Sequence, residues 1–357
     1  MGMLDRLDPE TLYAALTRRD PAYEGVFYVA VRTTGVFCRP TCPAPPPKKA
    51  NCEFFKNARE AMLAGFRPCK RCRPLSHPNE TSTVVRELVE AVERDPAKRW
   101  RDADFDRLNI HASTARRQFR KRFGMTFVEY ARARRLGEAF KTIRAGERVI
   151  AAQIDAGYES GSGFRDAFSR IMGAPPVSQK TRVLFAAWFD TPLGPMTAIA
   201  DDRALYLLDF ADCRGLERQI DRLRTRLKAG IAPGRTPPIA CIEAELAAYF
   251  DGSSTHFETP LVRLGSTFQN TVWDALREIP AGETRSYAQL AQTVGRPRAV
   301  RAVAQANGAN QFAIAIPCHR VINANGELGG YGGGVAKKRW LLDHERKHQS
   351  PEKHGLL

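Results

Sequence analysis

Four of the eight cysteines in this chain form two close pairs, Cys38 with Cys42 and Cys69 with Cys72, and 26 residues separate the pairs. Two short loops of this kind can bring four thiolates around one metal ion, and zinc is the ion that four sulfur ligands favour outside redox chemistry. Clustered cysteines in a reducing compartment indicate metal ligation in preference to disulfides. The spacing by itself predicts a zinc ion that holds a small domain together.

Another cysteine, Cys318, is followed directly by His319 in the run IAIPCHRV. A histidine, whose ordinary pKa is about 6.5, can take the proton of a nearby thiol, and a carboxylate can stabilise the resulting cation. Adjacent side chains cannot easily share a direct hydrogen bond, so we expect a water molecule between them. We expect the remaining cysteines, Cys52, Cys213 and Cys241, to be buried small residues.

The overall composition favours a polyanionic partner for these nucleophiles. The 357 residues include 55 Lys and Arg against 39 Asp and Glu, a formal net charge of +16, which is typical of proteins that bind nucleic acid. The longest apolar run, residues 183–189, is too short to cross a bilayer, and the start of the chain lacks the apolar stretch of a secretory signal. We therefore expect a cytoplasmic, nucleoid-associated protein that does not bind membranes.

Length and patterning predict a multidomain α+β protein with two or three cores. Polar, proline-containing stretches at residues 74–83 and 173–182 mark domain boundaries. A third such stretch, residues 229–238, is expected to be a loop that joins two lobes of the last domain. The predicted parts are a small zinc-bound α/β domain (1–78), an all-α domain (82–180), an α/β lobe (183–262), a helical lobe (263–346) and a mobile tail (347–357).

The elements expected within these parts follow from local periodicity. Strand-like runs occupy residues 26–31, 184–189, 196–200 and 204–210, and the third segment becomes mainly helical after residue 267. Helical patterns occupy residues 84–92, 113–123, 127–143, 149–156 and 162–172, with Ser113 as a candidate N-cap. Aromatic residues at helical spacing should form the core of the all-α domain: Phe119, Phe123, Phe127 and Tyr130.

The all-α segment is also the most basic part of the chain. Eleven Lys and Arg lie between residues 116 and 148, opposed by three Glu. A solvated helix face is one explanation of such a run, and contact with DNA phosphates or bases is the other. Two helix-turn-helix units joined by a long helix resemble the AraC-type DNA-binding domain over residues 82–180, which implies two recognition helices in successive major-groove segments. The candidate DNA contacts are Arg116, Arg117, Arg120 and Arg165.

The runs VRTTGVFCRPTCPA (31–44) and AGFRPCKRC (64–72) resemble the amino-terminal domain of the adaptive-response Ada family over about residues 10–76. The resemblance implies that Cys38 is both a zinc ligand and the acceptor of methyl groups from methylphosphotriesters in DNA, while Cys42, Cys69 and Cys72 are ligands only. Methylation of one thiolate changes the net charge of the zinc ion and its four sulfur ligands from about −2 to about −1, so we expect tighter DNA binding afterwards. Arg67 and Arg71 could contact phosphates beside the site, although solvated charge is an equal explanation.

The run PCHRV, together with GGYGGG (329–334) and KRWLLDHE (338–345), resembles the O6-alkylguanine-DNA alkyltransferases over about residues 183–346. The resemblance implies a ribonuclease-H-like sheet in the first lobe and a winged-helix-like second lobe. It makes Cys318 the methyl acceptor, His319 its base acting through a water, and Glu345 the group that orients and stabilises the imidazolium.

Other roles come from the same resemblance. Arg301, on a helix rich in small residues, would occupy the gap left by an extruded base, and a closely packed core helix is the alternative explanation of that segment. Tyr287 would displace the 3′ phosphate and Asn310 would support the active-site turn. The guanine pocket would be lined by Gly329 and Tyr331.

These resemblances together imply a single-turnover DNA repair methyltransferase that is also a transcriptional activator. It would carry one zinc ion and transfer methyl groups irreversibly to Cys38 from phosphotriesters, and to Cys318 from O6-methylguanine and O4-methylthymine. The expected partners are alkylated and promoter double-stranded DNA and RNA polymerase, with a monomer as the working form. The alternative is a zinc-containing AraC-type regulator that binds alkylated DNA without methyl transfer.

Overall fold

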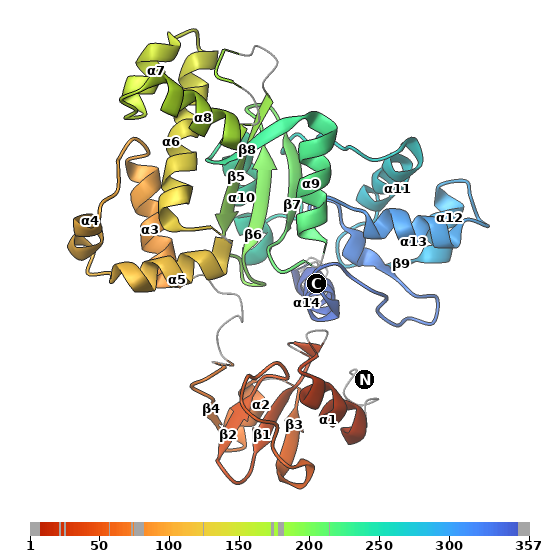
Figure 1. Ribbon diagram of the computed structural model, residues 1–357. Helices are drawn as coiled ribbons and strands as arrows, with labels where there is room; N and C mark the ends of the chain where they lie inside the picture. Colours follow the sequence, from red (N-terminus) through yellow and green to blue (C-terminus); the bar gives the residue numbers. More distant parts are fainter. Residues whose placement is uncertain are drawn as a thin grey trace, which may run out of the picture.

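The computed structural model describes residues 8–20, 23–24, 26–56, 58–72, 74, 82–123, 125–172, 175–177, 182–213 and 215–348. Three units follow one another along the chain, coloured red to orange, orange to yellow-green, and green to blue in Figure 1. Most of the two predicted boundary stretches falls outside the described residues. So does the predicted mobile tail, apart from Lys347 and His348, which end the last helix.

The first unit is a four-stranded sheet with the strand order β3-β1-β2-β4 and two short helices. Its strands are β1 (Tyr28–Val31), β2 (Val36–Cys38), β3 (Cys52–Phe55) and β4 (Arg67–Pro68), and its helices are α1 (Pro9–Arg18) and α2 (Ala58–Leu63). Strand β1 pairs antiparallel with β2 and β3, whereas β2 and β4 are parallel. Since parallel strands end at the same edge of a sheet, this pairing brings the two cysteine pairs together.

The second unit is helical, as predicted, and contains one helix that the periodicity did not indicate, α4. Its helices are α3 (Thr83–Arg94), α4 (Asp102–Arg107), α5 (Ala112–Phe123), α6 (Phe127–Arg144), α7 (Val149–Asp155) and α8 (Gly161–Met172). Phe119, Phe127 and Tyr130 are buried together as expected, while the side chain of Phe123 lies outside the described part. The prediction of Ser113 as an N-cap was wrong, because α5 begins one residue earlier.

The third unit opens with a second four-stranded sheet, of order β7-β6-β5-β8. Its strands are β5 (Arg182–Phe189), β6 (Met196–Ala200), β7 (Leu205–Phe210) and β8 (Ala229–Pro233), and its helices are α9 (Leu216–Leu227) and α10 (Pro237–Asp251). The predicted loop at residues 229–238 was therefore wrong. Residues 229–233 pair in parallel with β5, and Pro237 starts α10, where the missing amide hydrogen of proline has no cost.

The last lobe is mainly helical after residue 267, as predicted. Its elements are α11 (Thr267–Arg277), β9 (Arg285–Ser286), α12 (Tyr287–Thr293), α13 (Val300–Gly308), the 3-10 turn η4 (Cys318–Arg320), β10 (Val321–Ile322) and α14 (Val335–His348). Backbone hydrogen bonds from Leu208 to Gln311, at 2.8 Å, and from Ala313 to Leu208, at 2.7 Å, join this lobe to β7.

One hydrophobic core continues from the second unit into the third, so these two units are packed together. Leu136 on α6 and Phe168 on α8 belong to the same cluster as Phe185 on β5 and Leu341 on α14. Figure 1 shows α6 and α8 beside the sheet, where they cover its edge strand β8. Covering an edge strand protects unpaired backbone groups, which gives this packing a physical reason.

Within the described residues, the structure contains no helix with the length and apolar character that a bilayer crossing requires.

Candidate functional site

The first candidate site is the cluster of Cys38, Cys42, Cys69 and Cys72. Cys38 is the last residue of β2 and Cys69 directly follows β4, so the parallel pairing of these strands sets the two side by side. All four sulfur atoms lie within 4.8 Å of one another. Tetrahedral coordination with Zn–S bonds of about 2.3 Å requires sulfur atoms roughly 3.8 Å apart, so the donor set fits one zinc ion in both chemistry and size.

The protonation of these thiols is tightly linked. Hydrogen bonds from the Cys38 and Cys72 thiols hold the pKa of Cys42 far below its ordinary value. The same bond to Cys42 raises the pKa of Cys38. The cluster thus holds one thiolate easily and resists further ionisation, because four negative charges at this spacing repel. A dication would remove that repulsion, and when bound it would keep the sulfur atoms as thiolates.

The residues around the cluster differ in how accessible they are. Cys38 is 7% exposed and Cys42 6%, so the proposed acceptor lies on the inner side of the cluster. The backbone amide of Arg39 donates to the Cys72 sulfur at 3.5 Å, and the buried Arg39 side chain pairs with Glu24 at 3.3 Å. Arg67 and Arg71 are exposed next to Cys69 and Cys72, where a polyanion could reach them.

The second candidate site surrounds Cys318 at the start of η4. Asn310 donates from Nδ2 to the Cys318 sulfur at 3.1 Å and to the Ile316 carbonyl at 2.8 Å, and its Oδ1 accepts from the Phe312 amide at 3.0 Å. Asn310 thus ties the thiol to the turn before it; the supporting role that the resemblance implied for this residue stays a prediction. Burial raises the pKa of Cys318 to about 11, so a base is needed for the thiol to ionise near neutral pH.

His319 lies beside this thiol in the chain and is completely buried. Its Nε2 contacts Oε1 of Glu345 at 2.8 Å, whereas its Nδ1 has no hydrogen-bond partner among the described residues. The carboxylate requires a proton on Nε2, which leaves Nδ1 as a free base in the neutral ring. Burial lowers the pKa of His319 against the opposing effect of Glu345, so the ring is neutral and able to accept a proton.

Glu345 anchors a larger network than the sequence indicated. Besides His319, it accepts hydrogen bonds from Arg320 at 2.9 Å to each oxygen, from the Tyr249 hydroxyl at 2.8 Å and from the Gly282 amide at 3.1 Å. Although burial opposes ionisation, the bonds from His319 and Arg320 hold the pKa of Glu345 well below its ordinary value. The carboxylate is therefore permanently charged, and Arg320 offsets the cost of burying it.

A cavity of about 270 Å³ opens onto the Cys318 thiol. Tyr331 lines it, as predicted, and so does Tyr287, for which the predicted role was displacement of the 3′ phosphate. The Tyr331 hydroxyl is buried without a partner among the described residues. Gly329 was predicted to line this cavity but does not; its neighbours at residues 330–333 do. The Gly329 carbonyl instead accepts a hydrogen bond from Lys338 at 3.3 Å.

Several groups at this second site were not found by sequence reasoning. Asn307 donates to the Cys318 carbonyl at 3.3 Å, and Asp209 and Cys213 line the cavity from the other lobe. Burial lowers the pKa of the fully buried Lys338 to about 8 and raises that of Asp209 to about 6. Among the groups that sequence reasoning missed, only Arg320, the ion-pair partner of Glu345, could have been suspected, because it directly follows Cys318 and His319 in the chain.

The predicted DNA-contacting arginines are exposed on separate helices. Arg116, Arg117 and Arg120 project from α5, and Arg116 pairs with Asp102 at 3.2 Å. Arg165 is exposed on α8, and Arg301 on α13. Since three different helices carry these side chains, any common role depends on a ligand that spans them.

Three family descriptions match successive parts of the chain. Residues 11–74 match the metal-binding domain of Ada, residues 105–181 a helix-turn-helix domain, and residues 267–347 the DNA-binding domain of 6-O-methylguanine DNA methyltransferases. The first match includes the cysteine cluster, and the third includes Cys318, His319 and Glu345.

A relative from Escherichia coli strain K12, the bifunctional transcriptional activator/DNA repair enzyme Ada, is 33% identical over 353 residues, which cover 96% of this chain and 98% of the relative. The chain belongs to the Ada family. A methylated-DNA--protein-cysteine methyltransferase of Mycolicibacterium paratuberculosis is 43% identical over 159 residues, 44% of this chain and 90% of that protein. A solved structure of Mycobacterium tuberculosis OGT in complex with DNA is 39% identical in sequence. The match covers 46% of this chain and 94% of the OGT chain, with a TM-score of 0.40.

Membership of the Ada family identifies the first unit as its zinc-binding domain, with the four clustered cysteines as the ligand set.

Proposed function

We propose that this protein repairs alkylated DNA by transferring methyl groups to two of its own cysteines, and that it activates transcription in response. The observation that carries the proposal is the presence, in one chain of Ada length, of a four-thiol cluster and a buried Cys-His-Glu array on either side of two helix-turn-helix units. The regulator without methyl transfer is less favoured, because a DNA-binding role alone gives no reason for a neutral buried base beside a thiol.

Cys318 acts on a base lesion. The His319 Nδ1 takes the thiol proton through a bridging water, and the Cys318 sulfur attacks the methyl carbon of O6-methylguanine. A sulfur–carbon bond forms as the carbon–oxygen bond breaks, and guanine leaves as an anion with the electron pair. The proton that the imidazolium holds balances this charge and yields neutral guanine. Glu345 stabilises the imidazolium while it exists, and its charge is already compensated by Arg320. The same chemistry applies to O4-methylthymine.

Cys38 acts on a backbone lesion. A zinc ion held by the four clustered cysteines would keep the Cys38 sulfur as a thiolate at neutral pH without a general base. The Cys38 sulfur takes the methyl group of a phosphotriester, and the phosphodiester leaves as an anion. Cys42, Cys69 and Cys72 remain ligands. Both products are thioethers, so each site acts once.

Methylation of Cys38 also serves as the signal. A change of one unit charge about 4 Å from a phosphate is equivalent to roughly 1 kcal/mol in water and about 4 kcal/mol at a protein surface. Promoter affinity should rise by about fivefold to a thousandfold as a result. Arg67 and Arg71 lie exposed beside the cluster and are the proposed phosphate contacts.

Finer parts of the proposal concern the partners and the folds. We assign duplex contacts to Arg116, Arg117, Arg120, Arg165 and Arg301, and displacement of the 3′ phosphate to Tyr287. We expect a monomer that contacts RNA polymerase at promoters and works on nucleoid DNA. The order β7-β6-β5-β8, with β8 parallel to β5, supports a ribonuclease-H-like first lobe, and β9 and β10 with α11–α13 support a winged-helix-like second lobe.

Peptide mass measurement tests this proposal directly. After incubation with methylated duplex DNA, methylcysteine should be found at Cys38 and at Cys318. The variant Cys318→Ser should lose repair of O6-methylguanine and keep phosphotriester repair, and Cys38→Ser should show the reverse. Absence of methylcysteine at both positions would favour the regulator without methyl transfer, and labelling of Cys318 alone would make the zinc site structural.

A further inference from the structure

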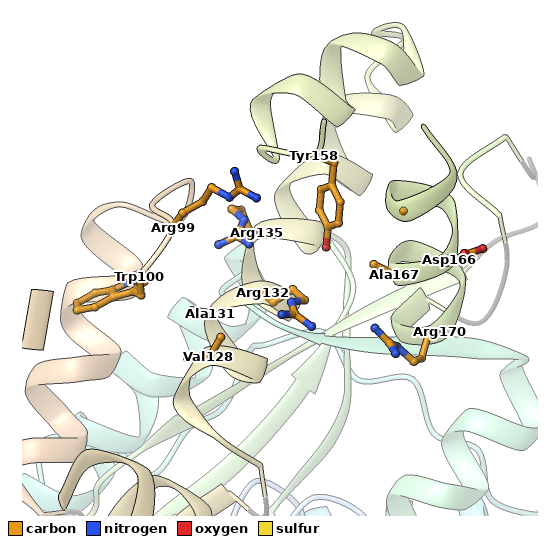
Figure 2. A pocket seen from close by; sticks show the side chains of 11 residues that line it. Arg99, Trp100, Val128, Ala131, Arg132, Arg135, Tyr158, Asp166, Ala167 and Arg170 are labelled. Carbon is orange, nitrogen blue, oxygen red and sulfur yellow. The ribbon is translucent and has the colours of Figure 1, made fainter. Parts of the chain in front are cut away.

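A feature that the two methyl-transfer sites leave unused is a cavity in the second unit, with a volume of about 560 Å³. It lies between the two helix-turn-helix units. Its walls come from the segment before α4, from one face of α6, from the turn between α7 and α8, and from α8 (Figure 2). Four arginines line it, Arg99, Arg132, Arg135 and Arg170, against a single carboxylate, Asp166.

Arg135 is the fixed part of this cavity. It is 8% exposed, and its Nε and Nη1 donate to the backbone carbonyls of Ala156, at 3.1 Å, and Lys98, at 3.0 Å. These partners are neutral, and the charges of Arg99 and Arg132 act against it. Burial lowers the pKa of Arg135, and the two neighbouring cations lower it further. A buried cation held only by carbonyls is costly unless an anion completes its surroundings.

A further donor in the cavity has no partner. The Tyr158 hydroxyl is a buried atom without a hydrogen bond within the described part of the chain, and its side chain lines the cavity. Figure 2 shows the Tyr158 hydroxyl pointing into the space between the arginines, and Arg132 and Arg170 reaching toward each other from α6 and α8. A buried donor left unsatisfied in this way indicates a missing acceptor.

We propose that this cavity binds a phosphate group, with Arg135 as its fixed donor and Arg132 and Arg170 as the two arms that close on it. A tetrahedral oxyanion has enough acceptor positions for the guanidinium groups together with the Tyr158 hydroxyl. The same chemistry is offered by a phosphate of the DNA backbone and by a free phosphorylated molecule. The first source rests on the proposed function, since it requires that this unit bind DNA; the second does not.

The test uses the full-length, zinc-loaded protein and the double variant Arg132→Gln/Arg170→Gln. Arg135 is left intact because its carbonyl bonds hold two segments together. The matched control is Arg94→Gln, an exposed arginine on α3 that does not line the cavity. Retained methyl transfer to Cys318 shows that each variant is folded. Two quantities are measured: affinity for an unmethylated 20-base-pair duplex over a range of salt concentrations, and the thermal midpoint with and without inorganic phosphate at constant ionic strength.

If DNA supplies the phosphate, the double variant should bind the duplex about tenfold or more weakly than the control. The slope of its affinity against salt should also fall by about 1 for each phosphate that the variant no longer neutralises. If a free molecule supplies it, phosphate should raise the midpoint of the wild-type protein and of the control, but not of the double variant. Equal duplex affinity, equal salt slope and equal response to phosphate in both variants would overturn the site. Failure of the wild-type protein to bind duplex DNA would count against the proposed function instead, because the phosphate measurement is independent of it.

Discussion

Replacement of His319 by glutamine tests the role of the proton acceptor apart from the other contacts of the Cys318 site. A glutamine amide can donate to Glu345 from nearly the place of the imidazole Nε2, so the carboxylate keeps its contacts with Arg320 and Tyr249. The amide cannot accept a proton. The substitution therefore removes proton transfer and leaves most of the buried network in place.

The size of the effect follows from the thiol. With the pKa of Cys318 raised to about 11, only about 1 in 4,000 molecules carries a thiolate at pH 7.4, equivalent to about 5 kcal/mol. A variant without the base depends on that fraction, so its transfer rate should fall about a thousandfold. Its rate should then rise about tenfold per pH unit between pH 7 and 9. In the wild-type protein the pKa of His319 is lowered, so the rate should be level above about pH 6.5 and fall only in more acidic solution.

Single-turnover transfer from a duplex with one O6-methylguanine, followed by mass of the Cys318 peptide, measures both profiles. Transfer from phosphotriesters to Cys38 in the same molecules is the internal control and should be unchanged. A level pH profile in His319→Gln, or a loss of less than tenfold, would show that the thiol ionises without this histidine.

Three other predictions concern stability and the metal. Glu345→Gln should lower the free energy of unfolding by about 3–5 kcal/mol at pH 7, because buried Arg320 loses its ion pair. The pKa of Glu345 is lowered in the folded protein, so its contribution to stability is present above the unfolded pKa of about 4.5 and is lost as the pH falls below that value. In urea unfolding, the difference in free energy of unfolding between wild type and variant should therefore be smaller at pH 4 than at pH 7. An unchanged difference would refute this. Gly230→Ala places a methyl group 2.5 Å from the Met172 carbonyl oxygen, so it should lower the free energy of unfolding in urea by about 1–3 kcal/mol. The control Gly308→Ala, whose methyl group meets nothing within 4 Å, should not destabilise the protein. Equal effects of the two substitutions would contradict the packing of α8 on β8. Cys72→Ser should abolish binding of the one zinc ion, measured by elemental analysis, and with it methyl transfer to Cys38. Methyl transfer to Cys318 should continue. Retention of zinc would show that three thiols are enough to bind the ion.

Local patterns were enough to find most helices and strands. The strand at residues 196–200 was predicted with its observed bounds, and α6 and α8 were predicted to within one residue at each end. These elements have a clear apolar periodicity, and the period is a property of neighbouring residues. The segment at residues 229–238 has prolines and glycines that favour a loop locally, and only its pairing with β5 makes part of it a strand.

The sequence by itself determined which cysteines are the proposed nucleophiles, because cysteine spacing and the run PCHRV are local features of the chain. The tertiary structure decided how those atoms are controlled. Glu345 meets His319 and Arg320 only because α14 packs against η4, and the two cysteine pairs meet only because β2 and β4 run parallel. The arginines of the cavity converge from three separate segments in the same way. Such contacts depend on the packing of residues far apart in the chain, and no local spacing encodes the distance between them.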